Sequence, residues 1–224
     1  MRTAAKRKKM KKQKILKTVQ LSLLSAIIAI LAFVPNLGYI KVPILAIQAT
    51  TVHIPVIIGS ILLGPVSGGI LGGIFGLTSL LNNTMQPGIT SFCFSPFIEI
   101  GAGLGGSPLA LIVCFVPRIL CGVVPYYIFK LIQERSKNEL KTRKFSLLLA
   151  GIAGSMTNTI LVMGMIYLFF GQQYAFARGI AFEAVLGVVL SVVGINGTIE
   201  AIIAALISSA IATAIYRSKI LNRI

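Results

Sequence analysis

Long apolar segments separated by clusters of basic residues constrain this chain more than any other feature of its sequence. One of them, residues 108–129, carries a single charge, Arg118. A segment of this length can cross a bilayer as a helix, because about 20 apolar residues suffice. The whole chain is 56% hydrophobic and only 12% charged, which lies well outside the balance of a soluble domain. We therefore expect an all-α membrane protein.

Six segments have the length and composition of membrane-spanning helices. They cover residues 18–35, 51–63, 67–81, 108–132, 145–170 and 182–216. The second and third segments are short and are joined by the tight turn "GPVSG". The connections after the first and third segments are longer than the roughly two to eight residues usual between bundled helices, so we expect them to have a function, such as that of a lid.

The basic residues are segregated along the chain, and this segregation predicts the topology. Of the 21 lysines and arginines, nine lie in residues 1–17, six in 130–144 and three in 217–223. Basic residues in short loops are retained in the cytoplasm, so both termini and the loop around 135–144 are expected inside the cell. An even number of spans agrees with this count, and the protein is expected in the cell membrane.

This topology predicts one six-helix transmembrane domain, residues 18–217, between basic cytoplasmic tails at 1–17 and 218–224. The first tail and apolar run could instead be a cleaved signal peptide, but no clear small-residue cleavage site follows them. The net charge of +16 could also indicate a nucleic-acid-binding protein. Segregated lysines that orient the chain and contact lipid account for the charge without nucleic acid.

No arrangement of residues carries recognisable catalytic or metal-binding chemistry. The three cysteines include no CxxC pair, His53 is the single histidine, and the chain contains no aspartate. The glycines of "GPVSGGILGGIFG" lack the lysine of a phosphate-binding loop. We therefore expect no enzyme, no catalytic residue, no metal and no cofactor in this chain.

Arg118 needs an explanation because a charge near the bilayer centre costs about 2.5–3.5 kcal/mol on insertion scales. It lies about ten residues, or roughly 15 Å, from the start of its helix, close to half of a ~30 Å apolar core. Pro117 has no N–H to donate, so the carbonyl of Val113 is expected to lack its helical partner.

Three further polar side chains, Asn158, Asn196 and Glu200, are expected at a similar depth, and the last two share a helical face. One interpretation is a buried ion pair between Arg118 and Glu200, with both asparagines bonded to backbone. The other is a polar pocket in which Arg118 meets an anionic or carbonyl-bearing ligand and the remaining groups hold its hydroxyl and amide groups. The two interpretations can coexist if the pair rearranges on binding.

Other polar and aromatic residues are expected near the outer side of the membrane, away from the basic cytoplasmic segments. His53 begins the second segment, Asn82 and Asn83 end the third, and Phe94 lies in the connection that follows. Helix caps and interfacial aromatic residues explain many such positions without a ligand. Together these four residues are candidates for the mouth of the pocket.

Small residues recur at four-residue spacing on several helices, where they permit close contact between helices in lipid. The rows are Gly68, Gly72 and Gly76; Ser22 and Ala26; Ser25 and Ala29; and Ala201, Ala205 and Ser209. Packing inside the domain is the simpler explanation of each row. The alternative is that at least one row, that of the first helix above all, faces another membrane subunit.

The stretch "TTVHIPVIIGSILLGPVSGGILGGIFGLTSLL", followed by "FSPF" and "VPRILCGVVPYYIFKLI", resembles the substrate-binding S components of energy-coupling factor (ECF) vitamin transporters. It looks most like the branch that includes proposed pantothenate carriers. The resemblance covers essentially the whole chain in size and topology, and it is most specific between Thr50 and Lys130.

The resemblance implies a six-helix subunit that captures a micronutrient outside the cell with its outer loops and its last three helices. It also implies partners, namely a transmembrane coupling subunit and two subunits that bind and use ATP. Small residues of the first helix belong to the docking surface in this family, and Ser22, Ser25, Ala26 and Ala29 match that pattern only loosely.

From these arguments we expect an S component for a water-soluble vitamin. Pantothenate comes first because its carboxylate suits Arg118, and riboflavin or another vitamin comes second. A stand-alone secondary transporter or channel and a membrane-embedded enzyme are the other classes. The sequence shows neither an inverted repeat with a coupling-ion site nor a catalytic cluster.

Overall fold

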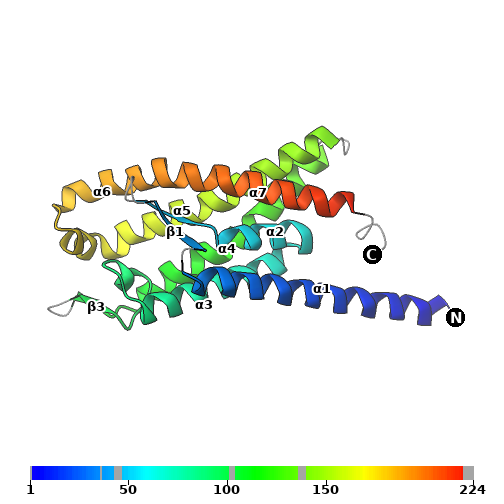
Figure 1. Cartoon of the computed structure of the whole chain (residues 1–224), viewed down its shortest axis with the longest axis horizontal. Helices are drawn as coiled ribbons and strands as arrows, with labels where there is room; N and C mark the ends of the chain where they lie inside the picture. The colour runs from blue at the N-terminus through cyan, green and yellow to red at the C-terminus, as the bar shows by residue number, and fades with distance from the viewer. Residues whose placement is uncertain (1, 36, 43–46, 101–103, 136–139, 219–224) are drawn as a thin grey trace.

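The computed structural model describes residues 2–35, 37–42, 47–100, 104–135 and 140–218. Within these ranges the chain is predominantly helical, as the sequence predicts (Figure 1). Its elements, in chain order, are α1 Arg2–Phe33, β1 Tyr39–Val42, β2 Ile47–Thr50, α2 His53–Leu63, α3 Pro65–Met85, the 3-10 helix η2 Ser91–Cys93, β3 Glu99–Ile100, β4 Leu104–Gly105, α4 Leu109–Arg135, α5 Leu140–Arg178, α6 Phe182–Ser191, the π-helix η3 Val192–Gly197 and α7 Thr198–Arg217.

The apolar segments make this a multi-pass membrane protein. Five helical stretches of the described chain are long and apolar enough to cross a membrane, and they are Met10–Phe33, Pro65–Met85, Leu109–Arg135, Thr142–Arg178 and Phe182–Arg217. The predicted second span is the shorter apolar helix α2, with 11 residues. At 1.5 Å per residue it measures about 16 Å, roughly half of a ~30 Å apolar core.

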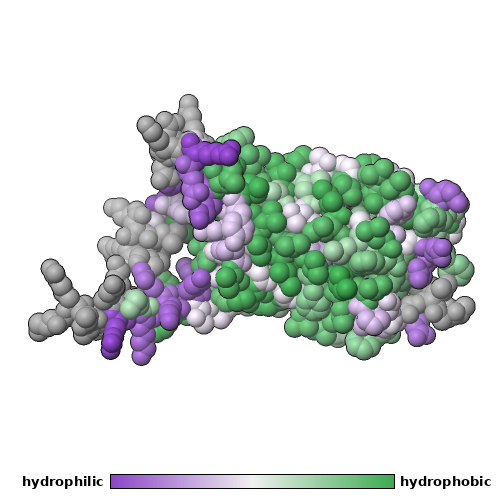
Figure 2. Space-filling model, turned by 180° about the vertical axis from the view of Figure 1, so that it is seen from behind, coloured by the Kyte–Doolittle hydropathy of each residue, from purple (hydrophilic) through white to green (hydrophobic). Residues whose placement is uncertain are grey.

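Basic residues gather at one end of the molecule, which we call the basic end, and the other end is called the distal end. α1 begins, α4 ends, α5 begins and α7 ends at the basic end (Figure 1). Figure 2 shows most of the hydrophilic surface there, while hydrophobic residues cover the body. The basic segment 1–17 is not separate from the first helix, because α1 is helical from Arg2. The predicted tail 218–224 lies outside the described residues except for Ser218.

α5 is longer than the predicted helix 145–170. It continues to Arg178, with a kink at Phe170, where φ is −131° and ψ is 16°. A Cβ at Gly171 would lie 2.9 Å from the ring of Phe182, so glycine leaves room for that ring at the kink. The predicted loop 171–181 is therefore mostly helix, and its turn is confined to residues 179–181.

The connection between α1 and α2 contains a strand pair that the sequence analysis did not predict. β1 and β2 pair antiparallel, with Tyr39 opposite Thr50. Beyond the ladder, the Thr51 N–H donates to the Gly38 carbonyl at 2.9 Å, which closes the hairpin against the start of α2. The pairing fixes the end of β2, and Thr50 is thereby placed beside α7.

The glycine row of α3 faces α4, which confirms internal packing for that row. A Cβ on Gly68 would lie 2.9 Å from the Gly122 carbonyl carbon, and one on Gly72 would lie 2.8 Å from the carbonyl carbon of Arg118. The two backbones are therefore in direct contact, as small residues allow in membranes. Because of this contact, α3 sets the position of the helix segment that carries Arg118.

Candidate functional site

Arg118 is buried, with 6% of its surface exposed. Its Nη1 donates a hydrogen bond of 2.8 Å to the carbonyl of Val113. Pro117 leaves that carbonyl without a helical N–H donor, as the sequence predicts. The neighbouring guanidinium donates to it instead. The side chain extends back toward the start of α4, as side chains in helices do. Arg118 therefore stabilises the helix around Pro117 as well as bringing a charge into the interior.

Two aromatic rings enclose the guanidinium. Its Cζ atom lies 5.0 Å from the ring centroid of Phe94 and 5.5 Å from that of Phe75. Both distances are within the range of a cation–π interaction. Phe94, which follows η2, was predicted as a site residue, whereas Phe75 was missed. The available signal was that Phe75 is the single aromatic residue on α3, one turn after Gly72.

Glu200 lies near the start of α7, and its carboxylate is buried. Oε1 accepts a hydrogen bond of 2.6 Å from the backbone N–H of Thr50, and Oε2 accepts one of 3.3 Å from the hydroxyl of Thr159. These bonds join α7 to the end of β2 and to α5. Glu200 therefore anchors the hairpin to the helices, a role that the sequence did not reveal.

The ion pair between Arg118 and Glu200 is not formed. Among the residues that the structure describes, the only ion pair joins Lys130 and Glu134, 3.6 Å apart at the basic end. Each of the two buried charges is instead met by neutral groups.

Several buried polar side-chain atoms have no hydrogen-bond partner in the described part of the chain. They include Nε of Arg118, Oδ1 of Asn158 and both ring nitrogens of His53. Buried polar atoms in proteins are normally hydrogen-bonded, so each such atom needs an explanation. They comprise an unused N–H donor, an amide acceptor and an imidazole, each of which has hydrogen-bonding capacity to spare.

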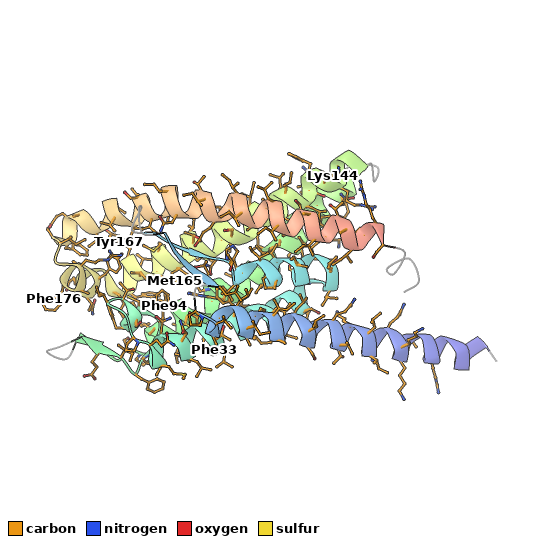
Figure 3. The ribbon with its side chains drawn as sticks, viewed as in Figure 1. Phe33, Phe94, Lys144, Met165, Tyr167 and Phe176 are labelled. Carbon is orange, nitrogen blue, oxygen red and sulfur yellow. The ribbon has the colours of Figure 1, made fainter. Side chains whose placement is uncertain are left out.

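An apolar cluster covers the distal side of this interior. Its buried members come from η2, α4, α5 and α6, and Phe94, Met165 and Tyr167 pack against it. Figure 3 shows these three labelled side chains between the helices, with Phe176 near the distal end. Val113, whose carbonyl accepts the hydrogen bond from Arg118, belongs to this cluster, so the apolar cluster adjoins the buried guanidinium.

Asn83 has a structural role in the connection after α3. Its Nδ2 donates to the Ser79 carbonyl at 2.8 Å, and its Oδ1 accepts from the Ser91 hydroxyl at 2.8 Å. Ser91 Oγ in turn accepts from the Gly88 N–H at 2.9 Å. These bonds occupy both ends of the Asn83 amide and hold η2, which Phe94 directly follows, in place. Asn82 is half-buried.

Asn196 lies inside the π-helix η3 and is half-buried. The sequence predicted one continuous α-helix here, in which Asn196 and Glu200 share a face. A π-helix bonds i to i+5 and changes that spacing, and such segments are frequent at functional sites. Gly197 lies against Thr159. A Cβ added to Gly197 would be 3.2 Å from Cγ2 of Thr159.

Comparison with known proteins shows the family of the chain. A family model for the substrate-specific component of ECF transporters matches residues 16–212. The chain belongs to this family. Among its relatives, "Pantothenic acid transporter PanT" of Lactococcus lactis subsp. cremoris (strain MG1363) is 36% identical over 173 residues, which are 77% of this chain and 80% of the relative. "Pantothenate transporter PanT" of Leuconostoc mesenteroides subsp. mesenteroides is 29% identical over 180 residues, 80% and 81% of the two chains.

This ECF substrate-specific component presents the predicted docking residues on α1. Ser22 and Ala26 are exposed, and Ser25 and Ala29 are half-buried. The hydroxyl of Ser25 bonds back to the Leu21 carbonyl at 2.8 Å, so its polar group is satisfied within the helix. Ser22 and Ala26 thus leave a narrow row of small side chains on the outer surface of the S component.

Proposed function

We propose that this S component captures pantothenate for uptake into the cell. Both relatives are named as transporters of pantothenate or pantothenic acid. The observation that carries the proposal is the state of Arg118, a buried cation whose Nε has no hydrogen-bond partner among the described residues and which forms no ion pair with Glu200. A carboxylate is the group that this cation fits best, and pantothenate carries one carboxylate.

The remaining polar groups suit the rest of the ligand, which has an amide and two hydroxyls. Oδ1 of Asn158 can accept from a hydroxyl or the amide N–H, and the His53 imidazole can donate or accept. Asn196 adds a second amide from η3. Glu200 already accepts two bonds, and a carboxylate has about four acceptor sites, so it can also receive a ligand hydroxyl. Phe94 closes this site from the distal side.

The proposal includes an orientation in the cell membrane, with the basic end and both termini in the cytoplasm. The starts of α1 and α5 and the ends of α4 and α7 lie at one end, which supports an even number of crossings. The six crossings are α1, α2, α3, α4, α5 and the continuous α6–η3–α7 segment. The distal end, with its hairpin and η2, then receives the vitamin from outside.

We further propose that a transmembrane coupling subunit and two ATP-binding subunits complete the transporter. ATP is bound and used by those partners, and this chain contributes binding without a cofactor of its own. The exposed Ser22 and Ala26 of α1 support a docking surface there, since small side chains permit close approach of another helix.

Titration with two ligands tests the role of Arg118. Purified wild-type and Arg118→Gln proteins are titrated with pantothenate and with pantothenol, in which a hydroxymethyl group replaces the carboxylate. Truncating one member of a buried charged pair costs about 2–5 kcal/mol, or roughly 30-fold to several thousand-fold in affinity. We expect that loss for pantothenate and a much smaller one for pantothenol.

An equal loss for both ligands would mean that Arg118 acts only on the fold. Thermal unfolding of Arg118→Gln, and of Arg118→Lys as a variant that keeps the charge, separates misfolding from loss of binding. Absence of pantothenate binding by well-folded wild-type protein would overturn the assignment of the vitamin itself.

A further inference from the structure

A groove of about 760 Å³ runs along the outside of the helical body between α1 and α7. α2 forms its floor and lies between these two helices in Figure 1. Leucine and isoleucine dominate the lining, and the α7 wall consists of Ile207, Ile211 and Ile215, which repeat every four residues along one helical face. The groove therefore offers an apolar channel that opens on the side of the protein.

The α1 wall of the groove changes character along its length. Leu16 and Leu23 are among the lining residues, and along one face Gln13, Lys17 and Gln20 near the basic end are followed by Leu24, Ile27 and Leu31. These six residues are spaced three or four apart, so they lie on one face of α1. A single stripe of the helix is thus polar and cationic at one end and apolar at the other, the pattern of an amphiphile.

Charge strengthens this pattern at the basic end. α1 contains no acidic residue, and the exposed side chains of Arg7, Lys11, Lys12 and Lys14 precede Lys17 on the same helix. Lys17 lies 16 residues before the end of α1 at Phe33, or about 24 Å at 1.5 Å per residue. That distance places its ammonium group near the boundary of a ~30 Å apolar core, where lysine reaches the headgroups.

We propose that the groove is a binding site for an anionic phospholipid of the leaflet that the basic end faces. The headgroup phosphate binds Lys17, with Gln20 beside it, and an acyl chain lies on Ile58 between α1 and α7. Charge complementarity selects this occupant, because a partner helix would fit the apolar channel equally well but would need an acidic group opposite Lys17. The inference depends on neither pantothenate nor Arg118.

The lipid site and the proposed docking row occupy different faces of α1. At 100° per residue, Ser22 and Ala26 point nearly opposite to the stripe from Lys17 to Leu31. A coupling subunit can therefore contact the docking row while a lipid remains in the groove. The lipid would then bridge α1 and α7.

Native mass spectrometry of the full chain, with phosphatidylglycerol or phosphatidylcholine of identical acyl chains added, measures this binding. We expect tighter binding of phosphatidylglycerol by the wild type, and Lys17→Gln to reduce that preference by about fivefold, the effect of one lysine near an anionic headgroup. Lys144→Gln, an exposed cation at the same end but outside the groove (Figure 3), should leave the preference unchanged.

A second pair of variants tests the apolar part of the site. Ile211→Trp fills the groove and should reduce binding of both lipids, whereas Ile202→Trp, exposed on α7 but outside the groove lining, should not. Equal binding of the two lipids by the wild type, or an unchanged preference in Lys17→Gln, would overturn the proposal. So would a photoreactive residue at position 211 that captures a protein helix instead of lipid in native membranes. Pantothenate titration of the same preparations should be unaffected, which keeps this test separate from the proposed function.

Discussion

Replacing Gly72 with alanine tests whether α3 sets the position of Arg118. A Cβ at Gly72 would collide with the Arg118 carbonyl oxygen and would lie 2.8 Å from Ile119 Cα, whereas ordinary contact begins at 3.4 Å. The colliding atoms belong to backbone and cannot rotate away. The two helices therefore have to separate by at least about 0.6 Å, the difference between 3.4 and 2.8 Å, and overpacking of this kind costs roughly 1–3 kcal/mol.

The neighbouring Gly73 supplies a matched control. A Cβ at Gly73 meets no atom within 4 Å, and alanine is more favourable than glycine inside a helix by about 1 kcal/mol. We therefore expect Gly73→Ala to be neutral or stabilising and Gly72→Ala to be destabilising. The gain in helix propensity is common to both variants, so their free energies of unfolding should differ by the overpacking cost alone, roughly 1–3 kcal/mol.

A thiol-reactive dye can follow thermal unfolding, because the chain has no tryptophan and its three cysteines are buried. The midpoint of unfolding should fall in Gly72→Ala and stay level or rise in Gly73→Ala. Pantothenate affinity should fall in Gly72→Ala alone, since Arg118 moves with α4. Equal stability and equal affinity of the two variants would refute the claim that the α3–α4 contact positions the site.

Three further changes have defined outcomes. Asn83→Ala should speed hydrogen exchange in residues 86–98, because two hydrogen bonds worth about 1 kcal/mol each are lost; unchanged exchange would contradict its role in holding η2. Burial raises the pKa of the Cys93 thiol. Maleimide labelling of the folded protein should therefore remain slow between about pH 7 and pH 9, where free thiols ionise. Fast labelling would show that the loop around Cys93 is open. Pro117→Ala supplies an N–H for the Val113 carbonyl and should free Nη1 of Arg118, so pantothenate affinity should change while the helix content measured by circular dichroism stays constant.

The helices were predictable because the length and apolar composition of a segment decide whether it can span a membrane, and a sequence displays both directly. The segment predicted at 108–132 corresponds closely to α4, Leu109–Arg135. The β1–β2 hairpin was not predictable in this way, since its strands are short and are held by contacts with α7 and the start of α2. Likewise, an apolar stretch such as 182–216 does not reveal which of its turns are π-helical.

Counting residues along each helix led us to expect four polar side chains in the interior, and Arg118, Asn158 and Glu200 are buried whereas Asn196 is half-buried. Counting residues gives height in the membrane but not the direction in which a side chain points. For that reason the sequence left the pairing of Arg118 with Glu200 open. It also missed Phe75, whose contact with Arg118 depends on how closely α3 and α4 approach.

The π-helix η3 also affects how relatives of this chain should be aligned. Its i to i+5 bonding accommodates one residue more than α-helix would. Deleting a single residue between Val192 and Gly197 would therefore restore a regular helix and leave α6 and α7 in nearly the same relative orientation. The carboxylate of Glu200 would still reach Thr50 and Thr159. A family member shorter by one residue here should therefore align with a gap inside residues 192–197, and its hairpin anchor should match Glu200.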